Sequence, residues 1–562
     1  MSSAADDTNE ERSPAVTVTV GAVIALAVVL LVTFLVGGGD GGGAASDEET
    51  VPPEVPMAAA ADAWLEAWTS GDVDAVESIG GSAAVAATRQ LRDALQVTSL
   101  TARAGVPNVG TGTVPFSATA SLAGLGDWSW TGEVSVHEIE VEEGDDEVEW
   151  AVAWAPSTLH PSLLDGRAFA RTRSWPARAP LLAVDGVTPL ASPALSSQVI
   201  GRVGEADVST LGEPYLPGDV AGVSGLQAVF ERALAGVPSG EVQVVDVAGG
   251  GGVVEVLHAF PGRPGAPVRT GLDLRVQAAA EAAIAAAPGN AALVAVSPST
   301  GEIRATVSNP MQGFNRALDG RYPPGSTFKI VTTAALLQSG VGPDTPASCP
   351  EVATINGRDF RNAEGAALGD IPFRRAFYES CNTAFVQLAA GLDQALLERT
   401  AALFGFNASP VEMAEPSEFP TPHSVVDQAS ASIGQGRVLA TPLQMASVAA
   451  TVQGQAHRPP RWRAPDGPVA GTPLPAGVAP VLQELMRLVV AEGTGTAARL
   501  PGEPVAGKTG TAEFGTQVPP RTHVWFVGFR GDLAFAVVVE DQQGFGGTIA
   551  APIARDFLSR LG

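Results

Sequence analysis

The chain has 562 residues, too many for one typical domain, and its 45% hydrophobic and 17% charged residues exclude a predominantly disordered protein. A formal net charge of −27, without any run of lysine or arginine, argues against nucleic-acid binding, which needs clustered positive charge. Only two of the 33 basic residues are lysines, Lys329 and Lys508. A GC-rich coding bias toward arginine explains the lack of lysine elsewhere, so these two positions need a reason of their own.

Residues 15–36 form a 22-residue stretch without a charged side chain, which is long enough to cross a bilayer as a helix. A cleavable signal peptide has a shorter apolar region of about 7–15 residues. Arg12 precedes the stretch, and no lysine or arginine follows before Arg89. The sequence therefore predicts a single-pass cell-membrane anchor, with residues 1–14 as a cytoplasmic tail and the bulk of the chain outside the membrane.

The segment 37–56 is rich in glycine, proline and acidic residues, which is typical of a linker. Residues 57–163 are predicted to form an α+β domain. Its first helix carries Trp64 and Trp68 on one face, and the strands that follow alternate apolar and polar residues.

A weaker pattern of turns and short apolar runs over residues 164–268 suggests an extended spacer with one amphipathic segment at 225–236. A third domain is predicted over 269–562. Helices are expected near 270–287 and 549–561, and pairs of strands over 291–309 and 523–541. Together these elements predict an antiparallel sheet built from both ends of the domain and flanked by helices.

Ser326 and Lys329 lie three residues apart in "PPGSTFKIV", where a Pro-Pro-Gly turn precedes a helical pattern. This spacing places both side chains on one helix face, so the amine is expected to reach the hydroxyl. A serine hydroxyl needs a neighbouring base to become a nucleophile. Lysine can be that base when burial or a nearby cation lowers its pKa, whereas arginine stays protonated.

Lys508 lies in "GKTGTAE", a strand-like segment in which Gly510 is expected to permit the close approach of a ligand. Thr509 and Thr511 supply hydroxyl donors for a carboxylate. A third piece is "ESCNTAF", with Ser380 and Asn382 two residues apart at the start of a helical pattern. Taken alone, "GKTGTAE" also fits an ordinary edge strand with a surface lysine, and "ESCNTAF" also fits an ordinary helix cap.

Cys349 and Cys381 are the two cysteines, and outside the membrane a disulfide between them would persist. Their spacing does not decide between a disulfide and two buried thiols.

The motifs Ser-x-x-Lys, Ser-x-Asn and Lys-Thr-Gly, in this order, are those of penicillin-binding proteins and class A β-lactamases. Residues 269–562 resemble the transpeptidase domain of a class B penicillin-binding protein. Four further stretches resemble that family: 297–310, 432–446, 493–498 and 525–529.

The first domain resembles the cone-shaped, nuclear-transport-factor-like (MecA-N-type) domain of some Gram-positive members of the family. The spacer is similar to the family's pedestal, or dimerisation-like, domain. Residues 178–191 and 222–236 carry degraded versions of pedestal motifs, and Gln227 stands where the family has glutamate.

The resemblance implies that Ser326 is the acylated nucleophile and Lys329 its base. Ser380 and Asn382 would relay protons and hold the substrate amide, while Lys508 would help to keep Lys329 neutral. The middle residue of the second motif is cysteine instead of aspartate, which we expect to be tolerated because this side chain need not face the substrate.

By the same resemblance, Thr509 and Thr511, with Gly510 between them, would bind the terminal carboxylate of a D-Ala-D-Ala stem peptide. The backbone N–H groups of Ser326 and Thr511 would form the oxyanion hole. The implied activity is peptidoglycan D,D-transpeptidation through a serine acyl-enzyme that β-lactams also form. No metal or cofactor is expected, and a multi-pass glycan polymerase is the expected partner.

Two other functions use the same pocket. A serine β-lactamase would need fast deacylation and has no use for a long stalk. A membrane-anchored β-lactam or muropeptide sensor would need a cytoplasmic output domain, and the predicted tail of residues 1–14 is too short for one. No segment resembles a glycosyltransferase domain.

Overall fold

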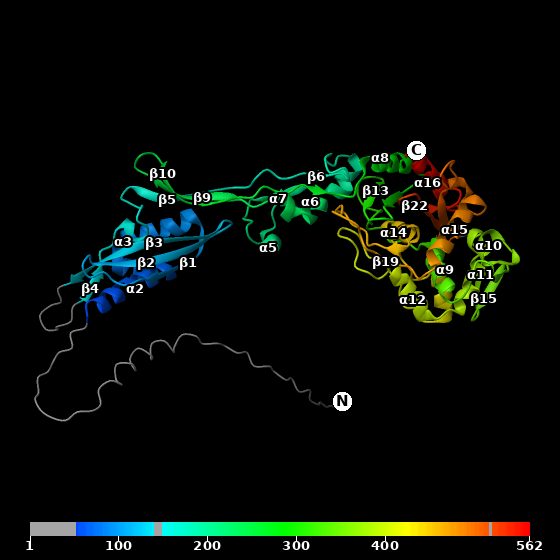
Figure 1. Ribbon diagram of the computed structural model, residues 1–562, viewed down its shortest axis with the longest axis horizontal. Coiled ribbons are helices and arrows are strands. Elements are labelled where there is room, and N and C mark those ends of the chain that lie inside the picture. The colour runs from blue at the N-terminus through cyan, green and yellow to red at the C-terminus, as the bar shows by residue number, and fades with distance from the viewer. Residues whose placement is uncertain (1–51, 140–148, 516, 518–519) are drawn as a thin grey trace, which may run out of the picture.

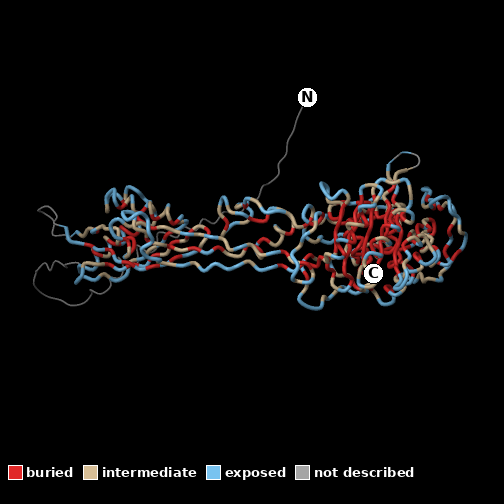
Figure 2. Tube along the Cα trace, turned by 90° about the horizontal axis from the view of Figure 1, so that it is seen from above, coloured by how far each residue is buried: buried red, intermediate tan, exposed pale blue. Residues whose placement is uncertain are grey.

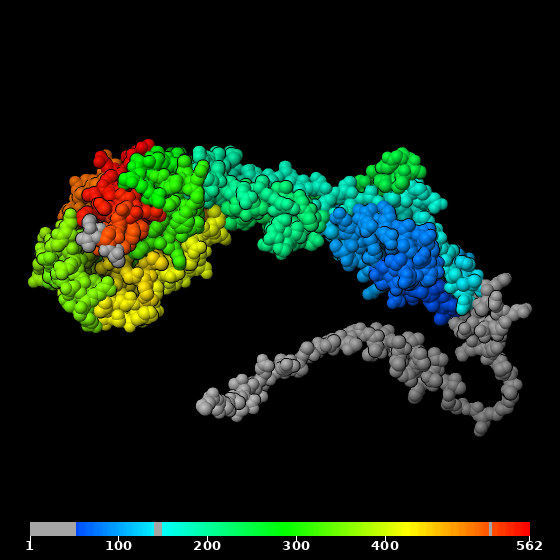
Figure 3. All heavy atoms as spheres, turned by 180° about the vertical axis from the view of Figure 1, so that it is seen from behind, coloured from blue at the N-terminus to red at the C-terminus, as the bar shows by residue number. Residues whose placement is uncertain are grey.

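The computed structural model shows an elongated molecule in which two folded ends are joined by a narrower stalk (Figures 1 and 3). Fully buried residues are concentrated in the C-terminal end (Figure 2). The structure describes residues 52–139, 149–515, 517 and 520–562.

The predicted cytoplasmic tail and membrane anchor, residues 1–36, lie outside the described residues, as does most of the predicted linker. Across the part of the chain that is described, no helix combines the length and the apolarity needed to span a bilayer.

The N-terminal domain packs two helices against a four-stranded antiparallel sheet of order β1-β2-β3-β4. Asp72 begins the second helix by accepting hydrogen bonds from the N–H groups of Asp74 and Ala75. Strand β3 alternates buried and exposed residues, and the predicted pair Trp64 and Trp68 is fully buried beneath the sheet. The elements are α2 (Glu54–Ser70), α3 (Val73–Leu95), β1 (Val97–Ala104), β2 (Thr113–Leu122), β3 (Gly126–Ile139), β4 (Glu149–Val152) and η1 (Pro156–Thr158).

The stalk begins with a three-stranded antiparallel sheet of order β10-β9-β5. Phe169 on β5 and Val242 on β9 are buried in the core of the N-terminal domain, so strands from the predicted spacer share that core. The stalk elements are β5 (Arg167–Ser174), β6 (Leu181–Leu182), α4 (Pro193–Leu195), η2 (Ser196–Ile200), β7 (Val203–Glu205), α5 (Val208–Leu211), β8 (Val220–Gly222), α6 (Gly225–Val229), α7 (Glu231–Ala235), β9 (Ser239–Asp246), β10 (Gly252–Phe260) and β11 (Val268–Arg269).

The buried carboxylate of Glu231 links three segments of the stalk. Glu231, which is 3% exposed, accepts hydrogen bonds from Tyr215 Oη (2.6 Å) and the N–H of Gly222 (2.7 Å), and pairs with Arg178 Nη2 (2.6 Å). Arg178 Nε also donates to Gln227 Oε1 (2.7 Å). The carboxylate missing at Gln227 is thus supplied one helical turn later. The predicted amphipathic segment is not one helix, because it breaks at Phe230 into α6 and α7.

The C-terminal domain contains a five-stranded antiparallel sheet of order β13-β12-β22-β21-β20, which confirms the predicted sheet built from both ends of the domain. The strands and the helices beside them are α8 (Leu274–Ile284), β12 (Ala291–Val296), β13 (Ile303–Asn309), β20 (Ala506–Phe514), β21 (Arg521–Arg530), β22 (Leu533–Gln542) and α16 (Ala550–Ser559).

Between β13 and β20 the chain forms most of the helices of this domain. They and the short strands among them are η3 (Gly325–Phe328), α9 (Lys329–Gln338), β14 (Pro346–Cys349), β15 (Val352–Ile355), β16 (Arg358–Arg361), η4 (Ala363–Gly365), β17 (Gly369–Pro372), α10 (Phe373–Tyr378), α11 (Asn382–Ala390), α12 (Gln394–Leu403), α13 (Val425–Ser432), α14 (Pro442–Gln453), β18 (Ala456–His457), β19 (Thr472–Pro473), α15 (Val478–Ala491) and η5 (Thr496–Ala498).

The sheet is buried on both faces. All six residues of β12 are buried, and alternate side chains enter two different cores. Leu293 packs in the cluster that contains α8 and α16, whereas Val294 packs in the larger cluster that contains α9 and α14. This arrangement leaves the edge strand β20 beside η3, where the sequence motifs lie.

Candidate active site

Ser326 lies in the tight turn η3 at the start of the buried helix α9, and its side chain is partly exposed. Gly325, just before it, has a left-handed backbone (φ 54°), which a glycine adopts without strain. The indole N–H of the fully buried Trp525 donates to the carbonyl of Pro323 (3.1 Å), which fixes the entry to this turn. The predicted position of Ser326 in the first helical turn is confirmed.

Strand β20 runs directly against this turn. A Cβ atom at Gly510 would lie 2.9 Å from the carbonyl oxygen of Pro324 and 2.8 Å from Thr327 Cγ2. A Cβ atom at Gly325 would lie 2.8 Å from the carbonyl oxygen of Thr511. The close approach at Gly510 is therefore made by the protein's own turn, and the close approach of a ligand to this glycine stays a prediction. The contact brings Ser326 beside Thr511.

Lys329 is completely buried and is held by the second motif. Its Nζ donates to the carbonyl oxygen of Ser380 (2.7 Å) and to Asn382 Oδ1 (2.7 Å), and lies 3.4 Å from Ser380 Oγ. Among the residues that the structure describes, no hydrogen bond joins Lys329 Nζ to Ser326 Oγ, although the two residues share one helical run as predicted.

The carbonyl oxygen of Ser380 and Asn382 Oδ1 together can accept both hydrogens of a neutral lysine amine. A neutral amine has two N–H hydrogens and one lone pair, and two carbonyl oxygens at 2.7 Å use both hydrogens. Burial, and then the positive charge of Lys508, lower the pKa of Lys329 well below its ordinary value. The surroundings therefore favour the form of Lys329 that can accept a proton.

Lys508, also completely buried, brings the third motif to the same serine. Its Nζ donates to Ser380 Oγ (2.8 Å) and to the carbonyl oxygen of Thr509 (3.0 Å). Burial lowers the pKa of Lys508 to about 7. The two lysines of the chain thus meet at Ser380, from motifs 51 and 128 residues away in the sequence.

Two aromatic rings form the apolar surroundings of these amines. Lys329 Nζ lies 5.1 Å from the ring centre of Phe385 on α11, and Lys508 Nζ lies 5.9 Å from that of Phe377 on α10. Both rings are fully buried. Neither phenylalanine was predicted as a site residue, because an aromatic residue in a helical pattern has no feature that separates it from ordinary core.

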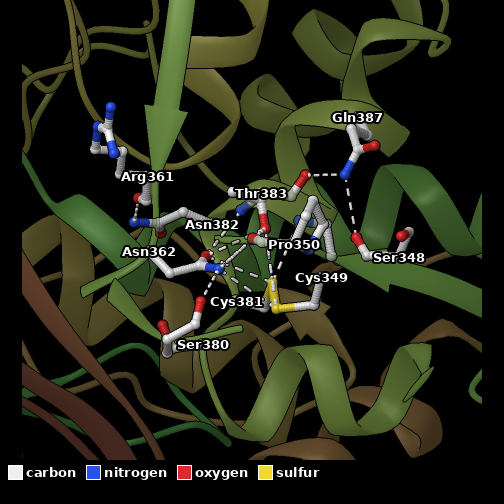
Figure 4. Close-up of a disulfide and its surroundings, with 12 residues drawn as sticks. Ser348, Cys349, Pro350, Arg361, Asn362, Ser380, Cys381, Asn382, Thr383 and Gln387 are labelled. Carbon is white, nitrogen blue, oxygen red and sulfur yellow. Dashed lines mark hydrogen bonds between the residues drawn. A yellow bond between two sulfur atoms is a disulfide. The ribbon is translucent and has the colours of Figure 1, made fainter. Parts of the chain in front are cut away.

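The second motif lies in a constrained loop before α11. Ser380 has a left-handed backbone (φ 61°), which is uncommon for serine. Cys381 caps α11 and forms a disulfide with Cys349 at the end of β14 (Figure 4). The two cysteines therefore form a disulfide and are not two buried thiols, a choice that their spacing in the sequence left open. It also shows that the cysteine in the middle of the motif faces away from Ser380 and Asn382, into the protein.

Neighbouring residues hold the second motif from the other side, as Figure 4 shows. Asn382 Nδ2 donates to the carbonyl oxygen of Arg361 (3.0 Å), which turns Asn382 Oδ1 toward Lys329. The buried Asn362 accepts from the N–H of Thr383 (3.0 Å) and donates to the carbonyl oxygen of Pro350 (2.8 Å). These bonds define where Ser380 and Asn382 stand.

Thr509 and Thr511 alternate with Lys508 along β20, so they lie on the opposite face of the strand from it. Thr511 Oγ1 accepts from the N–H of Gly546 (3.3 Å), and Thr509 Oγ1 lies 2.6 Å from Thr494 Oγ1. Thr494 was not predicted as a site residue. Its only signal in the sequence was its place in the stretch 493–498.

Comparison with known proteins agrees with this geometry. The family described as "Penicillin binding protein transpeptidase domain" matches residues 291–559. "Peptidoglycan D,D-transpeptidase PbpA" of Mycobacterium tuberculosis is 34% identical over 363 residues, covering 53% of this chain and 73% of that protein. The PbpA of Mycolicibacterium smegmatis is 35% identical over 331 residues, covering 48% of this chain and 66% of that protein.

A solved structure extends the similarity beyond this domain. Pseudomonas aeruginosa PBP2, crystallised in complex with WCK 5153, superposes with a TM-score of 0.58 at 25% identity and covers 70% of this chain and 96% of that one. This chain therefore belongs to the class B penicillin-binding proteins, and its C-terminal domain is a serine-type transpeptidase domain.

Proposed function

We propose that this chain crosslinks peptidoglycan as a D,D-transpeptidase, with Ser326 as the residue that carries the acyl group. The donor substrate would be a stem peptide ending in D-Ala-D-Ala, and β-lactams would acylate the same serine. The observation that carries the proposal is the meeting of Lys329 and Lys508 at Ser380, since both amines are buried and have lowered pKa values.

In the acylation step, Ser326 Oγ attacks the carbonyl carbon of the penultimate D-alanine. The hydroxyl proton passes to the lone pair of neutral Lys329 as the new O–C bond forms. Ser380 accepts a hydrogen bond from Lys508, so its own proton is free to be donated to the leaving nitrogen. Lys329 then returns a proton to Ser380, and the C–N bond breaks to release D-alanine.

Deacylation reverses these roles. The amine of a neighbouring stem peptide attacks the carbonyl carbon of the acyl-enzyme ester and passes a proton to Lys329 as the new C–N bond forms. The ester bond between that carbon and Ser326 Oγ then breaks, and Lys329 returns the proton to Ser326 Oγ, which restores the serine hydroxyl. Backbone N–H groups of Ser326 and Thr511 would stabilise the oxyanion in both steps, at about 2.7–4 kcal/mol for each donor. The hydroxyls of Thr509 and Thr511 and the positive charge of Lys508 would bind the donor's terminal carboxylate.

We place this activity outside the cytoplasmic membrane, on a chain anchored by residues 15–36. Two observations support this placement: the uncharged length of that segment, and the disulfide between Cys349 and Cys381, because disulfides persist in oxidising compartments. The N-terminal domain would be of the nuclear-transport-factor-like, MecA-N type, and a multi-pass glycan polymerase would supply the glycan strands.

The test is to follow the acyl-enzyme of the full-length chain by intact mass after a pulse of benzylpenicillin. A donor peptide ending in D-Ala-D-Ala is then added together with a D-amino acid as the acceptor amine. The proposal expects an adduct that lasts for hours, and release of D-alanine with formation of the exchanged peptide.

Two other outcomes would reject the proposal. An adduct that is lost within a second would identify a β-lactamase. A stable adduct without any exchange of the donor peptide would identify a binding module, such as a β-lactam sensor.

A further inference from the structure

Thr494 connects the second and third motifs, although it belongs to neither. It follows α15 and precedes η5, and its Oγ1 lies 2.6 Å from Thr509 Oγ1. Thr509 is 6% exposed and directly follows Lys508 on β20. Thr494 therefore touches a hydroxyl that our proposed function assigns to the binding of the donor carboxylate.

The same residue is fixed to the segment that leads into the second motif. The N–H of Thr494 donates to the carbonyl oxygen of Tyr378 (3.2 Å), two residues before Ser380. A Cβ atom at Gly493 would lie 2.2 Å from that oxygen, so only glycine allows this approach. The turn at 493–494 thus holds a fixed position between Tyr378 and Thr509.

The distances from Thr494 Oγ1 to its two neighbouring acceptors favour one direction for the hydrogen bond between the threonines. Thr494 Oγ1 has two acceptors in reach, Thr509 Oγ1 at 2.6 Å and the carbonyl oxygen of Tyr378 at 3.5 Å. The distance to the carbonyl of Tyr378 is long for a hydrogen bond, so Thr509 Oγ1 is the better acceptor for the Thr494 proton. When Thr494 donates to Thr509, the single proton of Thr509 is free for another acceptor.

We propose that Thr494 is a positioning residue for the carboxylate subsite: it donates to Thr509 and so orients the Thr509 proton toward the terminal carboxylate of the donor peptide or β-lactam. This inference rests on the proposed function, because it assumes that Thr509 binds that carboxylate. Without the hydroxyl of Thr494, Thr509 is free to rotate, and the ligand must order it on binding.

The experiment compares acylation by benzylpenicillin with acylation by its methyl ester, which lacks the carboxylate. Second-order acylation rate constants are measured on the full-length chain for wild type, Thr494→Val and Thr494→Ser. We expect Thr494→Val to slow acylation by the acid about tenfold, in line with the loss of one hydrogen bond that supports a charged group. The rate with the ester should change less than about twofold, and Thr494→Ser should restore the rate with the acid.

Thr496→Val is the matched control, because Thr496 lies two residues further along, at the start of η5, and is exposed. It should leave both rates unchanged. If Thr494→Val does not fold, Thr494→Ala removes the same hydroxyl without placing a second methyl group near Tyr378, and the same rates are expected.

An equal loss of rate with acid and ester would show that Thr494 acts only on the structure of the site and would overturn the inference. Unchanged rates in Thr494→Val would overturn it as well. Both results leave the proposed function intact, since that function is tested separately, by the lifetime of the wild-type acyl-enzyme and by its exchange of the donor peptide.

Discussion

Asn382 Oδ1 accepts a 2.7 Å hydrogen bond from Lys329 Nζ while the amide nitrogen of Asn382 donates to the carbonyl of Arg361. The second bond fixes the amide so that its oxygen, and not its nitrogen, faces the amine. A neutral acceptor at this position binds Lys329 without adding the negative charge that would raise the pKa of the amine. The neutral side chain of Asn382 therefore helps to keep the pKa of Lys329 low.

Asn382→Asp tests this relationship with almost no change of shape. The carboxylate would favour the protonated amine and raise the pKa of Lys329, so acylation by benzylpenicillin at pH 7 should fall about tenfold or more. The ascending limb of the pH profile, which reports the loss of the proton from Lys329, should move to higher pH. Asn108→Asp, at an exposed loop position of the N-terminal domain, is the control. A variant that reacts at the wild-type rate at pH 7 would refute this role.

The pH dependence of acylation should have two limbs. Acylation rises with pH as Lys329, whose pKa is well below the ordinary lysine value, loses its proton and becomes a base. It falls as Lys508, with a pKa of about 7, loses the charge that attracts the ligand carboxylate.

Arginine stays protonated across this range, so Lys508→Arg should move the descending limb of the profile upward by more than one pH unit. The measurement is the rate of acylation by benzylpenicillin between pH 5 and pH 9. A descending limb at the same pH in both proteins would assign it to another group.

The disulfide should control the geometry of the second motif, because Cys381 lies between Ser380 and Asn382 and is tied to Cys349. Loss of such a bond costs about 2–5 kcal/mol of stability. Cys349→Ser combined with Cys381→Ser should therefore lower both the Tm and the rate of acylation by benzylpenicillin.

A reductant should reproduce this loss in the wild type and have no effect on the double variant. Tm and acylation rate are measured with and without the reductant. A reduced wild-type protein with an unchanged Tm and an unchanged rate would contradict the assigned role.

Glu231→Gln should destabilise the stalk without changing the rate of acylation. Burial alone raises the pKa of this carboxyl, but the hydrogen bonds from Arg178, Tyr215 and the N–H of Gly222 together lower it below its usual value. The carboxylate therefore adds stability above a pH of about 4.5, and this stability is lost as the pH falls through the lowered pKa.

At pH 7 the Gln variant should lose about 2–4 kcal/mol of stability, because Arg178 keeps its charge without a carboxylate to pair with. Calorimetry measures the loss, and the exposed Glu205→Gln is the control. The acylation rate of the folded variant should equal that of the wild type. Equal stability of the two variants would show that the buried carboxylate is not needed.

The local parts of this structure could be predicted from the sequence. The strand pair β12 and β13, the turn before Ser326 and the strand around Lys508 all follow from residue types at short spacing. The three motifs could be combined because their order in the chain resembles one family. Lys329 and Lys508 could be predicted as site residues because they are the two lysines of the chain and both lie in these motifs.

The parts of the site that could not be predicted depend on contacts between distant segments of the chain. Lys329 is bonded to Ser380 and Asn382, 51 and 53 residues away, and no pattern within one segment encodes these contacts. The contact of Gly510 with Pro324 and Thr327 could not be predicted either, because these residues belong to a distant segment of the chain. Thr494 was passed over because a lone threonine in a loop has no distinguishing feature.

Intact-protein mass after exposure to benzylpenicillin tests whether Ser326 is acylated with the buried Lys329, in its neutral form, as the base. The wild type should gain the mass of one penicillin. Ser326→Ala should gain none, and Lys329→Arg should gain none in the same time, because arginine keeps the charge but cannot act as the base. A full adduct on Ser326→Ala, or an adduct on Lys329→Arg formed at the wild-type rate, would contradict the account.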